Sequence, residues 1–344
     1  MMQISPETQL FIREHSSDDV RVLALQAKKY PDINMPTAIT QIAGRQVAAE
    51  KIPSWREIEE IWYPKHLSLE QCSSEITARY KARLFQGDSL IDLTGGFGID
   101  CSFLATGFKS ATYVERQEEL CEIAAHNFPV LNLNHINIKN EDGVTYLQVM
   151  SPVDCLFLDP ARRNEHGGKT VAISDCEPNV AELEELLLQK ANRVMIKLSP
   201  MLDLSLALKE LKHTQEIHIL SVNNECKELL ILLGQTSPAE IAIHCVNLLT
   251  KGTQEEQHLV FTREQEQRSQ CTYTDSLGNY LYEPNASLLK AGAFRSIAAA
   301  YPVRKLHPNS HLYTSDSFIE NFPGRIFRIV NQCSFCLLYT SPSP

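Results

Sequence analysis

One segment of the sequence places an acidic residue directly before a glycine-rich turn. Residues 90–100 read LIDLTGGFGID, so Asp92 ends an apolar run and is followed by Gly95, Gly96 and Gly98. Glycine at such positions lets the backbone approach a ligand closely and adopt positive φ angles. The carboxylate of Asp92 can accept a hydrogen bond from an ammonium group of that ligand. We therefore predict a ligand-binding turn between a strand and a helix, with an ordinary glycine turn as the alternative.

A second segment places an aspartate and a proline at the end of an apolar strand. Residues 154–163 read DCLFLDPARR, and Asp159 and Pro160 follow the apolar run. Open α/β sheets bind ligands at the carboxyl ends of their strands, and a proline there stiffens the turn. We predict that Asp159, Pro160 and Arg162 are catalytic. Asp159 would orient or deprotonate an acceptor nitrogen, and the Arg162 guanidinium would stack on a base or bind phosphate. A turn without a chemical role is the alternative.

Two more carboxylates follow the next apolar runs. Glu115 ends the run 111–115, where it can accept hydrogen bonds from both ribose hydroxyls of a nucleoside cofactor. Asp142 can receive an adenine amino group, although a plain Asp-Gly turn explains it equally well. These positions suit S-adenosylmethionine or NAD, but Cys101 stands where the dinucleotide motif has its third glycine. We therefore predict S-adenosylmethionine as the cofactor. The predicted cofactor-binding residues are Asp92, Gly95, Gly96, Gly98, Glu115 and Asp142.

The elements that would position these residues alternate between short apolar runs and helical stretches from Ser89 onward. This alternation is typical of a mostly parallel sheet with helices on both faces. The last run follows its predecessor too closely for a parallel crossover, so it must return antiparallel. The predicted strands are Leu90–Leu93, Ala111–Val114, Ile136–Ile138, Cys155–Leu158, Arg193–Ile196, Glu216–Val222 and Glu228–Leu233. The predicted fold class is α/β, a Rossmann-like sheet with a helical N-terminal region and small C-terminal α+β domains.

The first 85 residues are predicted to be helical. Ser5 followed by Pro6 is a helix start, and further helical runs end before Pro31 and Pro53. The segment Ser68–Gln71 has the spacing of a capping box, which predicts one helix from there to Phe85. Most of this region is expected to be scaffolding.

Composition restricts the class of protein. At 344 residues with 43% hydrophobic content, the chain is expected to form two or three globular domains. Apolar stretches stay below the ~18 residues of a membrane helix, the N-terminus lacks the apolar run of a signal peptide, and the ten cysteines are scattered like reduced thiols. We predict a cytoplasmic protein with no membrane or metal partner, since the close pair Cys333 and Cys336 has no second pair to complete a zinc site.

The charge pattern bears on a nucleic-acid partner in two ways. The formal net charge of −10 argues against one, because binding to phosphates requires Lys and Arg. Between Ala286 and Val330, however, basic residues outnumber the acidic residues Asp316 and Glu320. We predict that this segment contributes RNA affinity. Its basic residues are Lys290, Arg295, Arg304, Lys305, Arg325 and Arg328.

Several stretches together resemble one family. They are residues 69–81 (LEQCSSEITARYK), 92–98 (DLTGGFG), 158–163 (LDPARR), 197–203 (KLSPMLD) and 283–290 (EPNASLLK). On these motifs the chain resembles the bacterial class I S-adenosylmethionine-dependent methyltransferases with a C-terminal THUMP-like domain. The resemblance implies a helical region 1–85, a methyltransferase domain 86–234, a small ferredoxin-like domain 235–278 and a THUMP-like domain 279–331. The last would be truncated by an anomalous tail, 332–344, which looks like translated adapter sequence.

Because THUMP modules accompany RNA-modifying domains, the resemblance implies methyl transfer to a base of tRNA or rRNA. The turn at Asp159 is similar to the Asp/Asn-Pro turns of amino-methylating enzymes, although Arg162 replaces their usual aromatic residue. Residues 195–200 (MIKLSP) contain no cysteine for a thiol adduct with a pyrimidine. A catalytically inactive cofactor-binding RNA module, a methyltransferase with a non-RNA acceptor and a nicotinamide oxidoreductase stay open as alternatives. Lys197 could form a buried ion pair or contact substrate, and the oligomeric state is not predicted.

Overall fold

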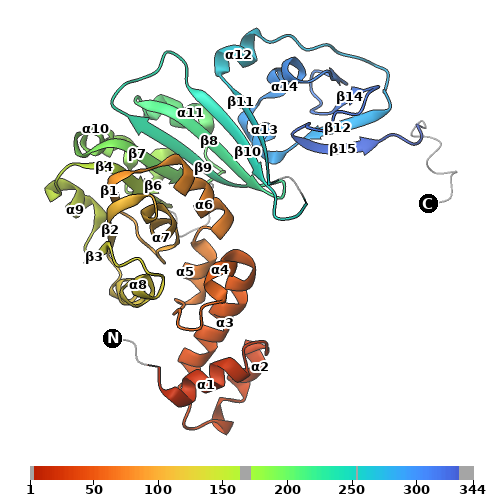
Figure 1. Ribbon diagram of the computed structural model, residues 1–344. Helices are drawn as coiled ribbons and strands as arrows, with labels where there is room; N and C mark the ends of the chain where they lie inside the picture. Colours follow the sequence, from red (N-terminus) through yellow and green to blue (C-terminus); the bar gives the residue numbers. More distant parts are fainter. Residues whose placement is uncertain (1–3, 163–171, 253–254, 333–344) are drawn as a thin grey trace. The chain divides into compact units, whose positions relative to one another are not determined.

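The N-terminal helices begin close to their predicted positions. The computed structural model describes residues 4–162, 172–252 and 255–332 of the chain (Figure 1). Ser5 caps α1 by accepting a hydrogen bond from the Thr8 amide at 3.2 Å, and Asn34 caps α3 through the Thr37 amide at 3.3 Å. The helices are α1 (Pro6–Glu14), α2 (Val20–Leu25), η1 (Ala27–Lys29), α3 (Met35–Lys51), α4 (Pro53–Arg56), α5 (His66–Gln71) and α6 (Glu75–Leu84).

The single helix predicted from Ser68 to Phe85 is wrong. α5 ends at Gln71 and α6 begins at Glu75, because the backbone at Cys72 and Ser74 is extended, with ψ angles of 160° and 155°. Between these two residues, Ser73 is buried and its hydroxyl donates a hydrogen bond to Asp100 Oδ2 at 2.7 Å. A long-range contact therefore occupies the residue at which the local pattern favoured a continuous helix.

The chain divides into two compact units, which are described separately. The first contains Met1–Lys197, Lys209–His213 and Leu232–Gln235. Its strands follow the order β9-β7-β4-β1-β2-β3, with only the end of β9 in this unit. The pairs β1–β2, β1–β4, β2–β3 and β4–β7 are parallel. The strands are β1 (Gly87–Asp92), β2 (Phe108–Glu115), β3 (Ile136–Asn140), β4 (Val153–Leu158) and β7 (Ala191–Leu198).

Helices follow the parallel strands of this unit, as the alternating pattern predicted. They are α7 (Ile99–Ala105), α8 (Glu118–Val130), α9 (Gly143–Val149) and α10 (Val180–Lys190), and α11 (Leu204–Glu210) ends in the same unit. After β4, a two-stranded antiparallel ribbon joins β5 (Ala161–Arg162) to β6 (Cys176–Glu177), with η2 (Ile173–Asp175) directly before β6.

The second unit contains Leu198–Leu208, Thr214–Ile231 and Thr236–Pro344. It orders its long strands β11-β10-β8-β9. β8 and β9 are joined by Asn223 and Asn224, whose φ angles of 48° and 68° suit a two-residue hairpin turn, so the last predicted strand does return antiparallel. β10 pairs with β8 in parallel, and β11 pairs with β10 antiparallel. These strands are β8 (Thr214–Val222), β9 (Glu225–Gly234), β10 (Ala242–Leu248) and β11 (Glu256–Phe261).

A separate small sheet completes the second unit. Its strand order is β13-β14-β12-β15, and all its pairs are antiparallel. The elements are α12 (Arg263–Arg268), β12 (Tyr280–Pro284), α13 (Ala286–Ala291), α14 (Phe294–Ala300), β13 (Arg304–Lys305), β14 (Tyr313–Ser315) and β15 (Gly324–Arg328). The predicted fold class is confirmed: an α/β protein with a large, mostly parallel sheet, N-terminal helices and a small C-terminal sheet. Residues 235–278, predicted as a ferredoxin-like domain, contribute β10 and β11 beside β8.

The N-terminal helices pack directly beneath the glycine-rich turn. Trp55, which is 2% exposed, meets the ring of Phe97 edge-on with 5.2 Å between ring centroids. Phe97 lies between Gly96 and Gly98, and Tyr63 and Ile123 belong to the same buried cluster. Aromatic pairs of this geometry add about 0.5–1.5 kcal/mol to the area that they bury. The helical region therefore fixes the position of the turn, beyond acting as general scaffolding.

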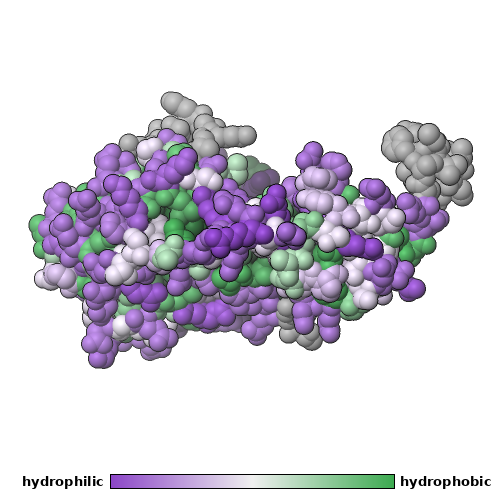
Figure 2. Space-filling view, turned by 90° about the horizontal axis from the view of Figure 1, so that it is seen from above, coloured by the Kyte–Doolittle hydropathy of each residue, from purple (hydrophilic) through white to green (hydrophobic). Residues whose placement is uncertain are grey.

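The described residues contain no helix that is long and apolar enough to cross a membrane. Figure 2 shows hydrophilic residues over most of the face in view, with smaller hydrophobic patches between them. Large apolar side chains that are exposed include Leu25 on α2, at 87%, and Val330 after β15, at 91%.

Gly143→Ala should destabilise the protein, because a Cβ at this position would lie 2.2 Å from the backbone oxygen of Leu93. The start of α9 would then have to move away from the end of β1. Overpacking of this kind costs about 1–3 kcal/mol, measurable by urea unfolding. Gln148→Ala on the exposed face of α9 is the control and should be neutral. Equal stability of the two variants would show that this close approach is not required.

Candidate functional site

The predicted site residues come together at one edge of the parallel sheet. β1 pairs with both β2 and β4, and Asp92 at the end of β1 lies opposite Tyr113 and Phe157. Glu115 and Asp159 each follow these partners by two residues, so three carboxyl groups occupy the carboxyl ends of adjacent strands. The amide of Asp159 donates a hydrogen bond to Thr94 Oγ1 at 2.6 Å. The turn after β4 is thus tied to the glycine-rich turn after β1.

Glycine is required in the turn after β1 for two different reasons. A Cβ at Gly95 would lie 2.3 Å from the ring of Tyr113, so only glycine fits against β2. Gly96 and Gly98 have φ angles of 54° and 86°, which side chains disfavour. The Tyr113 hydroxyl donates to the Gly96 carbonyl at 2.5 Å. A Cβ at Gly96 would meet only the Thr94 oxygen, at 3.8 Å, so the turn leaves open space beside Gly96.

Asp92 is buried, with 1% of its surface exposed. Its Oδ1 accepts a hydrogen bond from the Thr94 amide at 3.0 Å, whereas its Oδ2 has no hydrogen-bond partner among the described residues. Burial raises the pKa of Asp92 to about 8. The hydrogen bond from the Thr94 amide opposes this increase, and the negative charges of Asp100, Asp159 and Glu115 add to it. A buried acceptor without a partner costs free energy, and a cationic ligand group beside it would remove that cost.

The carboxylate of Glu115 holds the backbone on both sides of its strand end. Its Oε2 accepts from the Gly96 amide at 2.9 Å, and its Oε1 accepts from the Gln117 amide at 2.8 Å. Each carboxylate oxygen has a second lone pair, so both oxygens can still accept a ligand hydroxyl. Asp142 caps α9 by accepting from the amides of Val144 and Thr145 at 3.1 and 3.0 Å. Asp142 Oδ1 therefore has the structural role expected of an Asp-Gly turn. The predicted contact between Asp142 and a ligand stays a prediction.

The predicted catalytic turn begins at Asp159, whose side chain is 35% exposed. Pro160 is buried, and Arg162 ends the short strand β5. The side chain of Arg162 lies outside the described part of the chain, as do residues 163–171.

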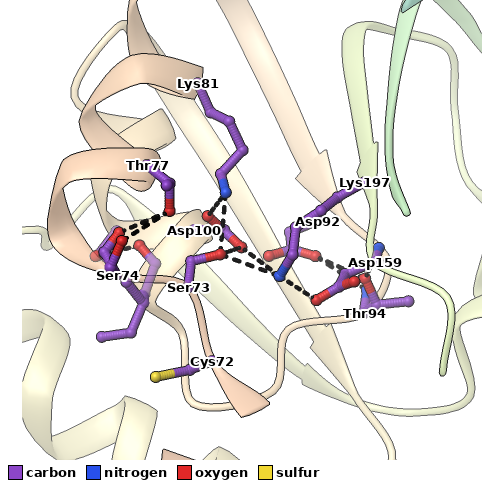
Figure 3. Close-up of polar contacts among 12 residues, drawn as sticks. Cys72, Ser73, Ser74, Thr77, Lys81, Asp92, Thr94, Asp100, Asp159 and Lys197 are labelled. Atoms are coloured by element: carbon purple, nitrogen blue, oxygen red, sulfur yellow. Dashed lines mark hydrogen bonds and ion pairs between the residues drawn. The ribbon is translucent and has the colours of Figure 1, made fainter. Parts of the chain in front are cut away.

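Asp159 belongs to a buried network of ion pairs (Figure 3). Lys197 Nζ contacts Asp159 Oδ2 at 2.5 Å and Asp100 Oδ2 at 3.4 Å. Lys81 Nζ contacts Asp100 Oδ1 at 2.9 Å, and both lysines donate to the Ser73 hydroxyl at 3.0 Å. Lys81 is fully buried, and Lys197 is 8% exposed. The network joins α6, α7, β7 and the turn after β4.

The lysines set the charge state of this network. Burial alone would raise the pKa of Asp100, but Lys81, Lys197 and the Ser73 hydroxyl lower it to about 2. Burial also raises the pKa of Asp159, and the opposing effect of Lys197 is smaller. Asp100 is therefore a permanent anion that compensates the lysines, whereas Asp159 is the more basic and more accessible carboxyl group.

Sequence reasoning left part of this network without a role. Lys197 was expected either to form a buried ion pair or to contact substrate. In the structure it forms buried ion pairs with Asp100 and Asp159. Ser73, Lys81 and Asp100 received no role, although Ser73 and Lys81 lie in a stretch that carried the family resemblance. Ser73, two residues before α6, and Asp100, the second residue of α7, become neighbours only through tertiary packing.

The basic residues of the C-terminal segment are mostly engaged within the protein. Lys305 is 4% exposed and donates to the Pro308 carbonyl at 2.9 Å, so its prediction as an RNA-binding side chain is wrong. Lys290 donates to the Leu202 carbonyl at 2.7 Å, and Arg304 pairs with Asp316 at 3.2 Å. Lys305 is not a surface charge, because its ammonium group is buried against the ring of Phe294.

The large, mostly parallel sheet with its helices matches the fold of a known methyltransferase structure. A crystal structure of a candidate methyltransferase from Porphyromonas gingivalis W83 matches with a TM-score of 0.84 and 34% identity, over 99% of this chain and 86% of that one. The chain belongs to the same family as this protein.

A model of a ferredoxin-like domain, PG_1098_Fer, matches residues 280–323. This is the segment for which the THUMP-like unit was predicted, and the THUMP-like assignment stays a prediction. No curated protein sequence matches the chain.

Two distant structures resemble only part of the chain. An rRNA methylase from Streptococcus thermophilus has a TM-score of 0.33 and 15% identity over 46% of this chain and 93% of that one. TrmK from M. capricolum in complex with S-adenosylhomocysteine has a TM-score of 0.37 and 13% identity over 47% and 68%. Similarity this low supports no statement about activity or acceptor.

Asp100→Asn should destabilise the protein at neutral pH, because it leaves two buried lysines with one carboxylate fewer. Breaking a buried pair in this way costs about 3–5 kcal/mol. The folded pKa of about 2 lies below the ordinary 3.8, so the wild-type protein should lose this stability as the pH falls from about 4 to about 2. Asp100→Asn should flatten that acid limb in urea unfolding measured across the range.

Asp88→Asn is the control, since Asp88 forms an exposed pair with Lys109 at 2.8 Å. Exposed pairs contribute about 0–1 kcal/mol. If the two variants lost equal stability, the network would not be a dominant constraint.

Proposed function

We propose that this protein is an S-adenosylmethionine-dependent methyltransferase that modifies a base nitrogen in tRNA or rRNA. The observation that carries the proposal is the hydrogen bond from the Asp159 amide to Thr94 Oγ1 at 2.6 Å. This hydrogen bond holds the partly exposed carboxyl group of Asp159 beside the glycine-rich turn, which is the proposed cofactor-binding turn. Methyl transfer by in-line displacement depends on this kind of fixed alignment between acceptor and cofactor.

The residues at the sheet edge fit the cofactor in three respects. The buried Asp92 Oδ2 lacks a partner among the described residues and suits the methionine ammonium. Glu115 retains lone pairs for the ribose hydroxyls. A Cβ at Gly96 would meet only the Thr94 oxygen at 3.8 Å, so the backbone there is open to close approach by the nucleoside. Asp142, capping α9 at the next strand end, is the proposed contact of the adenine amino group. When bound, the cofactor supplies an electrophilic methyl group.

Lys197 and Asp159 act on the acceptor in this proposal. Lys197 holds Asp159 Oδ2, so the carboxyl plane is fixed while its exposed part accepts a hydrogen bond from the acceptor N–H. Because burial raises its pKa, Asp159 is a stronger base than an exposed aspartate and takes the acceptor proton during transfer. Pro160 fixes the turn, and Arg162 is the proposed contact for the acceptor base or its phosphate.

Support for an RNA acceptor comes from the edge strand β15. Phe327 is 45% exposed, and the guanidinium carbon of Arg325 lies 5.9 Å from its ring centroid. Arg328 on the same strand is also exposed. Exposed aromatic rings beside arginine are platforms on which unpaired bases stack. Together with the implied THUMP-like unit, this strand is the proposed RNA contact.

S-adenosylmethionine and S-adenosylhomocysteine should bind in titration calorimetry, and NAD should not. Glu115→Ala should weaken cofactor binding by about 1–3 kcal/mol through lost charge-assisted hydrogen bonds. Glu118→Ala, at an exposed position three residues further on, should bind normally. Binding of NAD alone, or an unchanged affinity of Glu115→Ala, would contradict the assignment.

Asp159→Ala should lower the rate of methyl transfer about 10²–10⁴-fold, the usual effect of losing a positioned acid–base group. The readout is transfer from labelled cofactor to bulk tRNA and rRNA, followed by nucleoside mapping. Cofactor affinity should change little. The melting temperature should fall less than in Asp100→Asn, because Lys197 keeps Asp100 as a partner and the Asp159 side chain is 35% exposed.

Asp159→Asn separates alignment from base catalysis, since the amide oxygen still accepts a hydrogen bond but takes up no proton. Normal turnover of the alanine variant would exclude a catalytic role for Asp159. A loss of melting temperature as large as that of Asp100→Asn, with a rate loss that disappears once the variant is assayed well below its melting temperature, would reduce it to a structural turn residue. Absence of transfer by the wild-type protein to either RNA would favour a binding module or another acceptor.

Phe327→Ala should weaken RNA binding by about 1–3 kcal/mol if a base stacks on the ring, with no change in salt dependence. Arg328→Gln should instead reduce the slope of log affinity against log salt concentration by roughly 1. Leu25→Ala, an exposed apolar residue on α2, is the control. Fluorescence anisotropy with labelled tRNA measures both quantities, and wild-type behaviour of both variants would remove β15 from the RNA contact.

A further inference from the structure

Three histidines far apart in the sequence lie on one face of the second unit's long strands. His218 on β8 is directly opposite His244 on β10 in the parallel register, so both side chains point to the same face. On β11, His258 pairs with Val246, and Val260 pairs with His244. Since alternate residues of a strand share a face, His258 is the diagonal neighbour of His244 on that same face. Glu216, two residues before His218, also shares it.

The ring contacts confirm this juxtaposition. The His218 and His244 rings stack with centroids 4.3 Å apart and planes 14° apart. His244 Nδ1 lies 3.2 Å from His258 Nε2, and His218 Nε2 lies 3.3 Å from Glu216 Oε2. One ligand-type atom from each of Glu216, His218 and His244 lies within 4.8 Å of the others. Imidazole nitrogens and a carboxylate oxygen therefore converge on one small volume.

The contact between His244 and His258 also suits a metal. The hydrogen-bond contact between His244 Nδ1 and His258 leaves Nε2 of His244 as its ligand atom. A ligand histidine whose other nitrogen is held by a neighbour is the usual arrangement around protein-bound zinc.

We propose that Glu216, His218 and His244 bind one divalent transition-metal ion of the zinc class, with His258 orienting His244. Two histidines and one glutamate are an established zinc donor set that leaves a further coordination position for water. Nitrogen ligands of tetrahedral zinc lie roughly 3.3 Å apart. Because the His218 and His244 rings stack with planes 14° apart, at least one ring rotates about its side-chain bonds so that both nitrogens face the ion. Glu216 is 43% exposed, which provides a route of entry. The site is independent of the proposed methyl transfer, and the bound ion cross-links β8 and β10.

The test uses the full chain with Cys333→Ser and Cys336→Ser, which removes the close cysteine pair as a competing ligand. After chelation and dialysis, titration with zinc alone should show one equivalent bound, and zinc should raise the melting temperature. Cobalt(II) should give d–d absorption bands without the charge-transfer band of a thiolate ligand. His244→Ala should abolish the tight site. His258→Ala should weaken it about 10–100-fold, as loss of an orienting partner does.

His311→Ala is the matched control, because His311 lies in the same unit and stacks on Phe294. It should bind zinc normally. Glu216→Gln changes a half-exposed side chain to one of the same size, so this variant should fold. It therefore tests the zinc site even if His244→Ala fails to fold, and we expect it to bind zinc at least tenfold more weakly. The proposal is overturned by no zinc binding, by binding that survives both Glu216→Gln and His244→Ala, or by a cobalt spectrum with thiolate bands.

Discussion

Two lysine side chains in the interior of the first unit require compensating negative charge. Lys81 is fully buried and Lys197 nearly so, and transferring such charges out of water costs several kcal/mol per ion unless they are paired. The necessary carboxylates come from Asp100 on α7 and Asp159 after β4, with Ser73 bridging both lysines. Four segments from different parts of the sequence must therefore dock in one arrangement. Any alternative packing would leave an ion unpaired, so the network selects the geometry at the carboxyl edge of the sheet.

The same geometry fixes the glycine-rich turn from two further sides. Tyr113 on β2 occupies the space that a side chain at Gly95 would need, and Trp55 packs against Phe97 from the helical region. Thr94 Oγ1 then receives the amide of Asp159. The turn, the second strand, the N-terminal helices and the Asp-Pro turn thus constrain one another. This explains why a region predicted to be scaffolding contributes to the site through packing, without supplying a ligand.

The sequence predicted those features that depend on local pattern. Alternating apolar runs identified the strands, and glycine spacing together with Asp159-Pro160 identified the two turns at the sheet edge. Features set by tertiary contacts could not be predicted. The break between α5 and α6 depends on Ser73 reaching Asp100, and Lys305 is buried against Phe294 although the adjacent Arg304 is partly exposed. The histidine cluster depends on strand register, since His218, His244 and His258 have no recognisable spacing along the chain.

The carboxyl groups at the sheet edge also explain why a cation suits this place. Asp92, Asp100, Glu115 and Asp159 converge there. The lysines compensate Asp100 and Asp159, whereas Asp92 Oδ2 has no hydrogen-bond partner among the described residues. Burial therefore keeps Asp92 largely protonated, as its raised pKa of about 8 shows. A ligand that brings positive charge to Asp92 Oδ2 restores the ionised form and supplies the missing hydrogen-bond donor. S-adenosylmethionine carries both an ammonium and a sulfonium, whereas its demethylated product keeps only the ammonium. In the proposed function, the electrostatics of the edge would therefore favour the methylated cofactor over the product, because the product has lost the positive charge of the sulfonium.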